Sequence, residues 1–201
     1  MSKFRTRTFA NLPLTIAAIA TFVAALCPVA AHAKAGVIFD FENGTQGWSG
    51  NGVSFSQAAT GATSGKHSLK IANYDGSFVW IGSDQAASSA ARALHNASLL
   101  YFDVTFTSNV VLKKDKRGNQ WFSFIAAAVG ADGKWRQGKG MVAVPVVNGV
   151  LKAGTYPLKL AIADMPKPAA DSAKLTIKLG PNSSGLAKPI TFYIDSVRTA
   201  K

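Results

Sequence analysis

Apolar residues recur at every second position along most of this chain after Lys34. In one run, Phe102, Val104 and Phe106 alternate with more polar neighbours. A period of two places the apolar side chains of a strand on one face, so that face alone can be buried. Strands buried on one side are typical of antiparallel sheets. The same alternation recurs in the ranges 37–41, 69–71, 122–124, 142–146, 158–162, 175–179 and 190–194.

Turn residues separate these runs. Asp75-Gly76, Asp132-Gly133 and Asn148-Gly149 each lie between apolar runs, and such dipeptides accept the positive φ angles of tight hairpins. Only the stretch from Ala86 to Leu94 has a helical pattern. About ten short strands without α/β alternation predict an all-β fold, a two-sheet antiparallel β-sandwich of the jelly-roll type. Residues 34–201 are expected to form it as a single domain.

The first 33 residues have the three parts of a Sec signal peptide. A basic start is followed by an apolar stretch from Leu14 to Val29 and by the small-x-small site Ala31-His32-Ala33. Pro28 interrupts the apolar stretch, which disfavours a membrane-spanning helix of about 20 apolar residues. The sequence therefore predicts a bacterial protein that is secreted or periplasmic, with no transmembrane anchor in the mature chain.

The chain has few side chains for catalysis. Its one cysteine, Cys27, lies in the leader, which excludes disulfides and thiolate metal sites from the mature protein. His67 and His95 are too few for a zinc site, and no local pair of carboxylates suggests a glycosidase. We therefore expect no enzymatic activity. Lys and Arg outnumber Asp and Glu by 22 to 10, but an exported protein rarely meets nucleic acid, so we expect no nucleic-acid partner.

Three segments, taken in order, carry a family resemblance. They are FDFENGTQGW at residues 39–48, SGKHSLKI at 64–71 and FYIDSV at 192–197. This set resembles the calcium-bearing carbohydrate-binding modules of the galactose-binding-like superfamily, which open with FE-x-G-x-x-GW, continue with SG-x-x-SL and close with Y/F-I-D-x-V. The resemblance spans nearly the whole mature chain and implies a jelly-roll fold and a sugar ligand.

The resemblance also implies a structural calcium ion that joins the first and last strands. Glu42 and Asp195 would supply carboxylate oxygens, and backbone carbonyls near Asn43 and Lys66 would complete the shell. Calcium takes six to eight oxygen ligands, so this donor set suits it. The alternative is that Glu42 pairs with a lysine and Asp195 caps a turn. Trp48 of the first motif is expected to pack in the core.

A sugar site needs an exposed aromatic ring beside hydrogen-bonding side chains, because sugars present apolar C–H faces and a rim of hydroxyls. If the strands that carry them are neighbours, six candidates line one concave sheet. Trp121 and Trp135 could equally be core residues, and Trp80 is expected in the core. The six candidate ligand-binding residues are Tyr101, Asp103, Trp121, Trp135, Arg136 and Gln137.

A basic loop of Lys113, Lys114, Lys116 and Arg117 precedes Trp121. Such a run is often only a solvated turn, but beside an aromatic ring it favours an anionic partner. The sequence thus predicts an exported, non-catalytic, monomeric carbohydrate-binding protein whose partner is a polysaccharide or cell-envelope glycan, neutral or acidic. Two alternatives stay open: a jelly-roll polysaccharide lyase or glycosidase, and a surface or matrix assembly protein without a sugar site.

Overall fold

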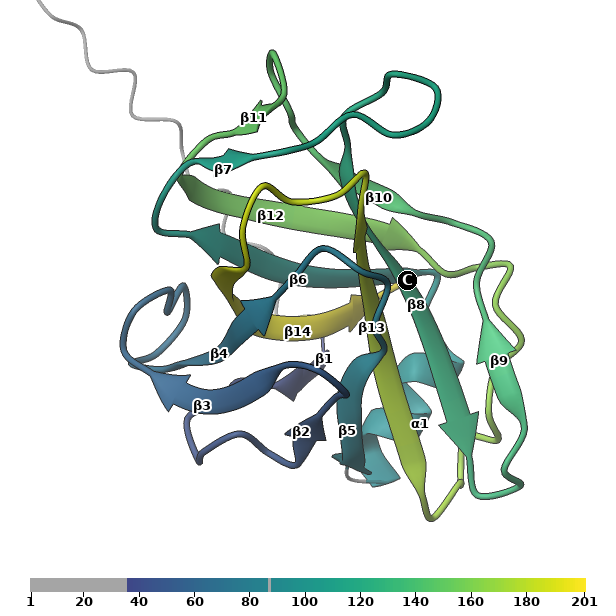
Figure 1. Cartoon of the computed structure of the whole chain (residues 1–201). Helices are drawn as coiled ribbons and strands as arrows, with labels where there is room; N and C mark the ends of the chain where they lie inside the picture. The colour runs from purple at the N-terminus through teal and green to yellow at the C-terminus, as the bar shows by residue number, and fades with distance from the viewer. Residues whose placement is uncertain (1–35, 87) are drawn as a thin grey trace, which may run out of the picture. The chain divides into compact units, whose positions relative to one another are not determined.

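Two antiparallel sheets face each other in the computed structural model, which describes residues 36–86 and 88–201 (Figure 1). The described residues form fourteen strands and one helix, so the predicted β-sandwich is confirmed. Five of the fourteen strands are short, with two or three residues each. The predicted signal peptide, residues 1–33, lies outside the described residues.

The first sheet contains six strands. Its order is β12 (Gly154–Ala161), β6 (Leu99–Phe106), β14 (Ile190–Ala200), β4 (Ser68–Tyr74) and β3 (Ser54–Ala58), and β1 (Gly36–Phe39) also pairs with β14. The terminal strands β1 and β14 are therefore direct neighbours. Pro157 is accommodated because β12 is an edge strand, where a missing backbone N–H costs no ladder bond.

The second sheet also contains six strands and carries the candidate site. Its order is β10 (Val142–Val144), β8 (Phe122–Gly130), β13 (Leu175–Ser183), β5 (Ile81–Ala86) and β2 (Trp48–Ser49), and β9 (Trp135–Gln137) also pairs with β8. A separate small sheet joins β7 (Val110–Val111) to β11 (Val150–Leu151).

Two of the three predicted hairpin turns are confirmed. At Asn148-Gly149, Val147 and Val150 exchange backbone hydrogen bonds of 3.0 Å, and both central residues have positive φ. Asp132-Gly133 joins the paired strands β8 and β9. The third is wrong as a hairpin, because Asp75-Gly76 carries the chain from β4 in the first sheet to β5 in the second. A turn dipeptide specifies a local reversal and not the sheet that the next strand joins.

The core lies between the two sheets. Phenylalanine rings from the first sheet meet rings from the second, with centroids 5.3 Å apart for Phe102 and Phe124 and 5.5 Å apart for Phe106 and Phe122. The predicted helix is confirmed as α1 (Ser88–His95), whose buried face packs against β1, β5, β13 and β14. Trp48 is buried as predicted and packs edge-on against Phe39 and Phe41. No helix within the described residues is long and apolar enough to cross a membrane.

Candidate functional site

A groove of about 580 Å³ lies on the outer face of the second sheet. Strand β8 turns Phe122 and Phe124 into the core, so the alternate residues Ser123 and Ile125 face outward and line the groove. The loop after β9 and the end of β13 complete the wall. The full lining is Phe78, Trp121, Ser123, Ile125, Gln137, Gly138, Lys139, Met141 and Asn182.

A glycine on β13 makes room for an aromatic side chain on this face. A Cβ at Gly180 would lie 2.8 Å from the ring of Phe78 and 2.9 Å from Ile125. Real Cβ atoms do not make contacts that short, so a larger residue would displace the ring. The absence of a side chain at Gly180 is therefore what lets Phe78 lie across the outer face of the sheet.

Three aromatic rings follow one another across this face. The centroids of Phe78 and Trp80 are 5.0 Å apart, and those of Trp80 and Trp135 are 4.8 Å apart, both in edge-to-face geometry. Phe78 is 44% exposed and Trp135 is 47% exposed. Together with Trp121 in the groove wall, these rings present a band of accessible aromatic surface beside polar side chains, hereafter the aromatic band.

The polar side chains of the groove are oriented by contacts within the protein. The Gln137 side-chain oxygen accepts the indole N–H of Trp135 at 3.4 Å, and the Asn182 side-chain oxygen accepts the backbone N–H of Ser183 at 2.9 Å. The amide NH₂ group of each residue is then the end left for a ligand. Lys139 is held through its backbone N–H, which donates to the Asp164 carboxylate at 2.9 Å.

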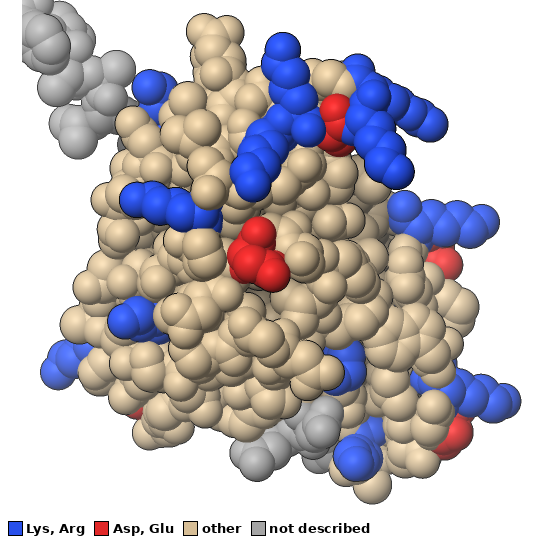
Figure 2. Space-filling view, viewed as in Figure 1, with Lys and Arg blue, Asp and Glu red and all other residues tan. Residues whose placement is uncertain are grey.

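The basic loop lies between β7 and β8, next to Trp121. Lys and Arg side chains gather at the upper edge of the view in Figure 2, where Figure 1 places this loop, whereas the surface over β8 and β13 is mostly uncharged. The one acid in the loop, Asp115, accepts hydrogen bonds from the backbone N–H groups of Arg117 and Asn119 and from the Trp121 indole. The backbone N–H of Asn119 is the largest cause that lowers the pKa of Asp115.

The six predicted ligand-binding residues do not share one sheet. Trp121 and Gln137 line the groove, and Trp135 borders it in the aromatic band. Tyr101 and Asp103 face outward from β6, which belongs to the first sheet. The prediction that all six line one sheet is therefore wrong, because alternation shows which face of a strand is buried but not which sheet the strand joins.

Outside the groove, Tyr101 and Asp103 have partners of their own. The Lys159 ammonium and the Arg198 guanidinium lie 5.9 and 5.6 Å from the centroid of the Tyr101 ring. The Asp103 carboxylate accepts the Thr63 hydroxyl at 2.6 Å and lies 3.6 Å from Arg198. These contacts join both side chains to neighbours on the first sheet, and their role in binding stays a prediction.

Arg136 is engaged in an ion pair. Its guanidinium donates to both carboxylate oxygens of Asp132, at 2.5 and 2.9 Å, which lowers the pKa of Asp132 to about 2. In β9, Arg136 lies between Trp135 and Gln137, so the alternation of the strand turns it to the other face.

Sequence reasoning missed several groove residues. Phe78 is not among the predicted site residues, and Trp80, predicted in the core, lies half-buried in the aromatic band. A signal was available, because Phe78, Trp80 and Gly82 alternate with Val79 and Ile81. Lys139 and Asn182 carry no local signal, since only the folding of the β9–β10 loop and of β13 brings them together.

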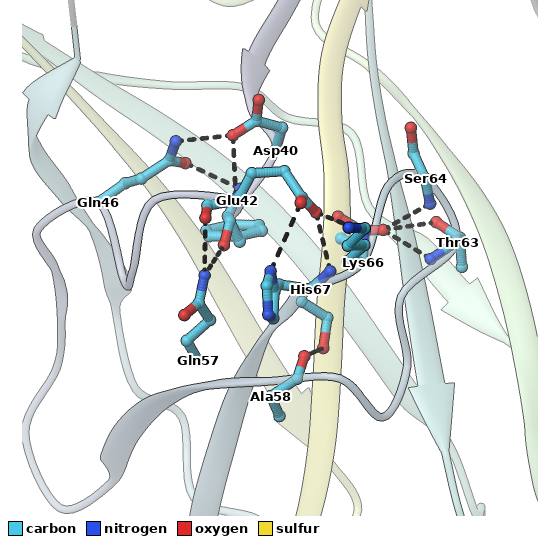
Figure 3. Close-up of polar contacts among 12 residues, drawn as sticks. Asp40, Glu42, Gln46, Gln57, Ala58, Thr63, Ser64, Lys66 and His67 are labelled. Atoms are coloured by element: carbon cyan, nitrogen blue, oxygen red, sulfur yellow. Dashed lines mark hydrogen bonds and ion pairs between the residues drawn. The ribbon is translucent and has the colours of Figure 1, made fainter.

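A second polar cluster joins the start of the domain to the loop between β3 and β4. Figure 3 shows the Glu42 carboxylate directed at this loop, where one oxygen accepts the backbone N–H groups of Lys66 and His67, both at 2.8 Å. The N–H of His67 is the largest cause that lowers the pKa of Glu42. Gly65 fits here because it has φ +74° and because a Cβ would lie 2.5 Å from the Glu42 carboxylate.

The same loop also holds Asp195 of β14, which is fully buried. One of its carboxylate oxygens accepts the backbone N–H groups of Thr63 and Ser64, at 2.6 and 2.9 Å, and the Thr63 hydroxyl at 3.0 Å. The other accepts the N–H of Ser196 at 2.6 Å. Burial raises the pKa of Asp195 although these donors act against it. Loop 63–67 thus joins Glu42 and Asp195, hereafter the amide tie.

The calcium ion predicted for this place needs six to eight oxygen ligands. In the structure this loop presents hydrogen-bond donors instead: Lys66 directs its N–H rather than its carbonyl at Glu42. One carboxylate oxygen of Glu42 and one of Asp195 each accept two or more hydrogen bonds. Within the described residues no group of three or more His, Cys, Asp or Glu could hold a metal ion. These contacts do not fit a calcium ion held by Glu42, Asn43, Lys66 and Asp195, and calcium stays a prediction to be tested.

No family model matches the sequence, and neither does any curated protein. Solved structures do share its fold. A carbohydrate-binding module specific for non-crystalline cellulose is 14% identical and has a TM-score of 0.51, with 84% of this chain and 96% of that chain covered. A structure from work on the promiscuous specificity of β-sandwich carbohydrate-binding modules is 12% identical, with a TM-score of 0.50.

That second match covers 83% of this chain and 62% of the other. An exo-β-agarase also matches, with 17% identity, a TM-score of 0.50, and 82% of this chain but only 24% of the agarase covered. At these identities the likeness is one of fold. The chain therefore has the fold of the β-sandwich carbohydrate-binding modules, as the three sequence motifs predicted.

Proposed function

We propose that this protein is an exported, non-catalytic carbohydrate-binding protein that holds a polysaccharide in the groove of the second sheet. The observation that carries the proposal is the aromatic band of Phe78, Trp80 and Trp135 beside Trp121. A soluble protein has no packing reason to leave two such large rings nearly half exposed on one face.

The chemistry of the groove suits a sugar chain. Pyranose rings stack their C–H faces on aromatic rings, and their hydroxyls need hydrogen-bonding partners at the rim. Ser123, Gln137 and Asn182 supply such partners along the wall. The elongated arrangement, an aromatic band continuing a groove, suits several successive sugar units better than a single one.

The non-catalytic part of the proposal is supported by the composition of the groove. A glycosidase places two carboxylates across the scissile bond. The residues that line this groove include no Asp, Glu, His or Cys. Export is supported by the leader at residues 1–33, and the fold is one used by carbohydrate-binding modules.

Affinity electrophoresis of the purified protein through gels containing single polysaccharides tests the proposal. We expect retardation in at least one polysaccharide and its loss in Trp121→Ala. Tyr101→Ala is the matched control, because it removes an aromatic ring from the outer face of the other sheet. Loss of binding in Tyr101→Ala alone would move the site to the first sheet. Release of reducing ends would instead support the lyase or glycosidase alternative.

A further inference from the structure

We infer that the groove selects polysaccharides that carry anionic substituents, because its lining side chains offer hydrogen-bond donors and one positive charge and include no carboxylate. This inference rests on the proposed function of the same groove. It concerns the class of the ligand, a glycan with carboxylate or sulfate groups.

The orientation of the two amides is the first argument. Within an amide side chain only the oxygen can accept an N–H. The Trp135 indole and the Ser183 backbone N–H therefore fix which end of Gln137 and Asn182 faces them. The acceptor end of each amide is used inside the protein. The NH₂ donors of both amides are directed away from these contacts and are available to a ligand.

The charge of the groove is the second argument. Lys139 is its one charged lining residue, and it is exposed. The Asp164 carboxylate accepts the Lys139 backbone N–H at 2.9 Å and is not part of the lining. Among the described residues none of the three ion pairs involves Lys139, so its ammonium group has no carboxylate partner.

The basic loop beside Trp121 extends this positive region. Lys113, Lys114, Lys116 and Arg117 are exposed and take part in none of the ion pairs of the described residues. Asp115, the acid among them, is directed inward to two backbone N–H groups and to the Trp121 indole. Four cations therefore stand next to one wall of the groove, and Asp115 is the one carboxylate in their loop.

This donor-rich surface discriminates between classes of sugar. A neutral hydroxyl both donates and accepts hydrogen bonds, so sites for neutral glycans profit from acceptors as well as donors. A carboxylate or sulfate only accepts, and its bonds to charged donors are roughly twice as strong as neutral ones. The aromatic band would stack the sugar rings while Gln137, Asn182 and Lys139 bind the anionic groups.

Two pairs of probes that differ mainly in charge test the inference. Polygalacturonate is compared with its methyl ester for carboxylates, and carrageenan with agarose for sulfates. We expect the charged member of at least one pair to bind at least tenfold more tightly, with the difference shrinking at 0.5 M salt because screening shortens to a few ångströms. Which pair responds identifies the anionic group.

Gln137→Glu is the decisive variant. It keeps the size of the side chain and an oxygen for the Trp135 indole but replaces the outward NH₂ donor by a carboxylate oxygen. We expect at least a tenfold loss of affinity for the charged probe, and a smaller loss in Lys139→Gln. Lys159→Gln, which removes the same charge from the first sheet, is the control and should bind normally.

The outcomes separate this inference from the proposed function. If a neutral member binds as well as its charged partner and Trp121→Ala abolishes that binding, the groove is a sugar site but the inference is wrong. Equal binding by Gln137→Glu and the unmodified protein also overturns it. If no probe in either pair binds, and no other polysaccharide does, both the inference and the proposed function fail.

Discussion

The indole rings of Trp80 and Trp135 lie 4.8 Å apart, at an interplanar angle of 74°, on the outer face of the second sheet. Trp80 directly precedes β5 and Trp135 begins β9, and in the sheet these strands are separated by β13 and β8. Both rings must therefore reach across their neighbours to meet. On the intervening strand β13, Gly180 carries no side chain, and the Phe78 ring occupies the space above it.

Replacement of Trp135 by alanine separates a binding role from a packing role. Because Trp135 is 47% exposed, we expect Trp135→Ala to cost less than the 3–5 kcal/mol or so typical of a buried aromatic residue. Polysaccharide binding should fall strongly, since the aromatic band loses one end. Urea unfolding and affinity electrophoresis measure the two effects. Trp48→Ala, at 3% exposure, is the buried counterpart and should lose the larger amount of stability.

Gly65 provides a test of the amide tie. Alanine at this position meets two obstacles, a positive φ of 74° and a Cβ 2.5 Å from the Glu42 carboxylate. Gly118→Ala is a matched control, because Gly118 has a similar φ of 84° but open space around its Cβ. We expect Gly65→Ala to lower the free energy of unfolding by about 1–3 kcal/mol more than the control, the cost of leaving a polar group unsatisfied. Equal losses would show that the Glu42 contact contributes nothing.

Glu42 gives the amide tie a dependence on pH. Hydrogen bonds from the backbone N–H groups of His67 and Lys66 hold the pKa of Glu42 below its usual value. A carboxylate with a lowered folded-state pKa stabilises the protein above its unfolded pKa of about 4.3, and this stabilisation is lost as the pH falls through the folded pKa. We therefore expect the unmodified protein to melt above Glu42→Gln at pH 6, with the difference in melting temperature shrinking as the pH falls below about 4.3.

Controls distinguish the effect of the Glu42 charge from the effects of two other titratable groups, His67 and Asp195. His67 lies 3.4 Å from Glu42 through its Nδ1 atom, so the comparison is repeated in His67→Gln, which keeps the backbone donors. Burial raises the pKa of Asp195, so the effect of Asp195 on stability changes with pH in the opposite direction. Asp195 is present in both the unmodified protein and Glu42→Gln, so this effect cancels in their comparison. A difference in melting temperature that does not shrink as the pH falls would contradict the role of the Glu42 charge.

The calcium prediction has a direct measurement. An ion that binds only the folded state stabilises it by RT ln(1 + [L]/Kd), about 2.7 kcal/mol at a hundredfold excess over Kd. Because N–H donors already satisfy Glu42 and Asp195, we expect the same melting temperature with calcium and with chelator. A clear rise with calcium would show that loop 63–67 turns its carbonyls toward an ion and would restore the calcium tie.

The local sequence pattern determined which strand faces are buried and where one tight hairpin forms. The alternation of apolar residues predicts the core faces of β6, β8, β12, β13 and β14, and Asn148-Gly149 predicts a tight hairpin. Trp48 in the core follows from the first motif. A tight turn depends on residues that are neighbours along the chain. The buried face of a strand depends on its own alternation of apolar and polar residues, because burial of the apolar face is favourable in each strand separately.

The tertiary structure alone decided the composition of the groove. Alternation makes Tyr101 and Trp121 equivalent, since each alternates with core phenylalanines, yet β6 and β8 join different sheets and only Trp121 reaches the groove. Likewise, nothing near Trp80 in the sequence indicates that its ring contacts Trp135. Strand order and side-chain partners arise from contacts between distant segments, and a period-two pattern contains no information about which strand lies next to which.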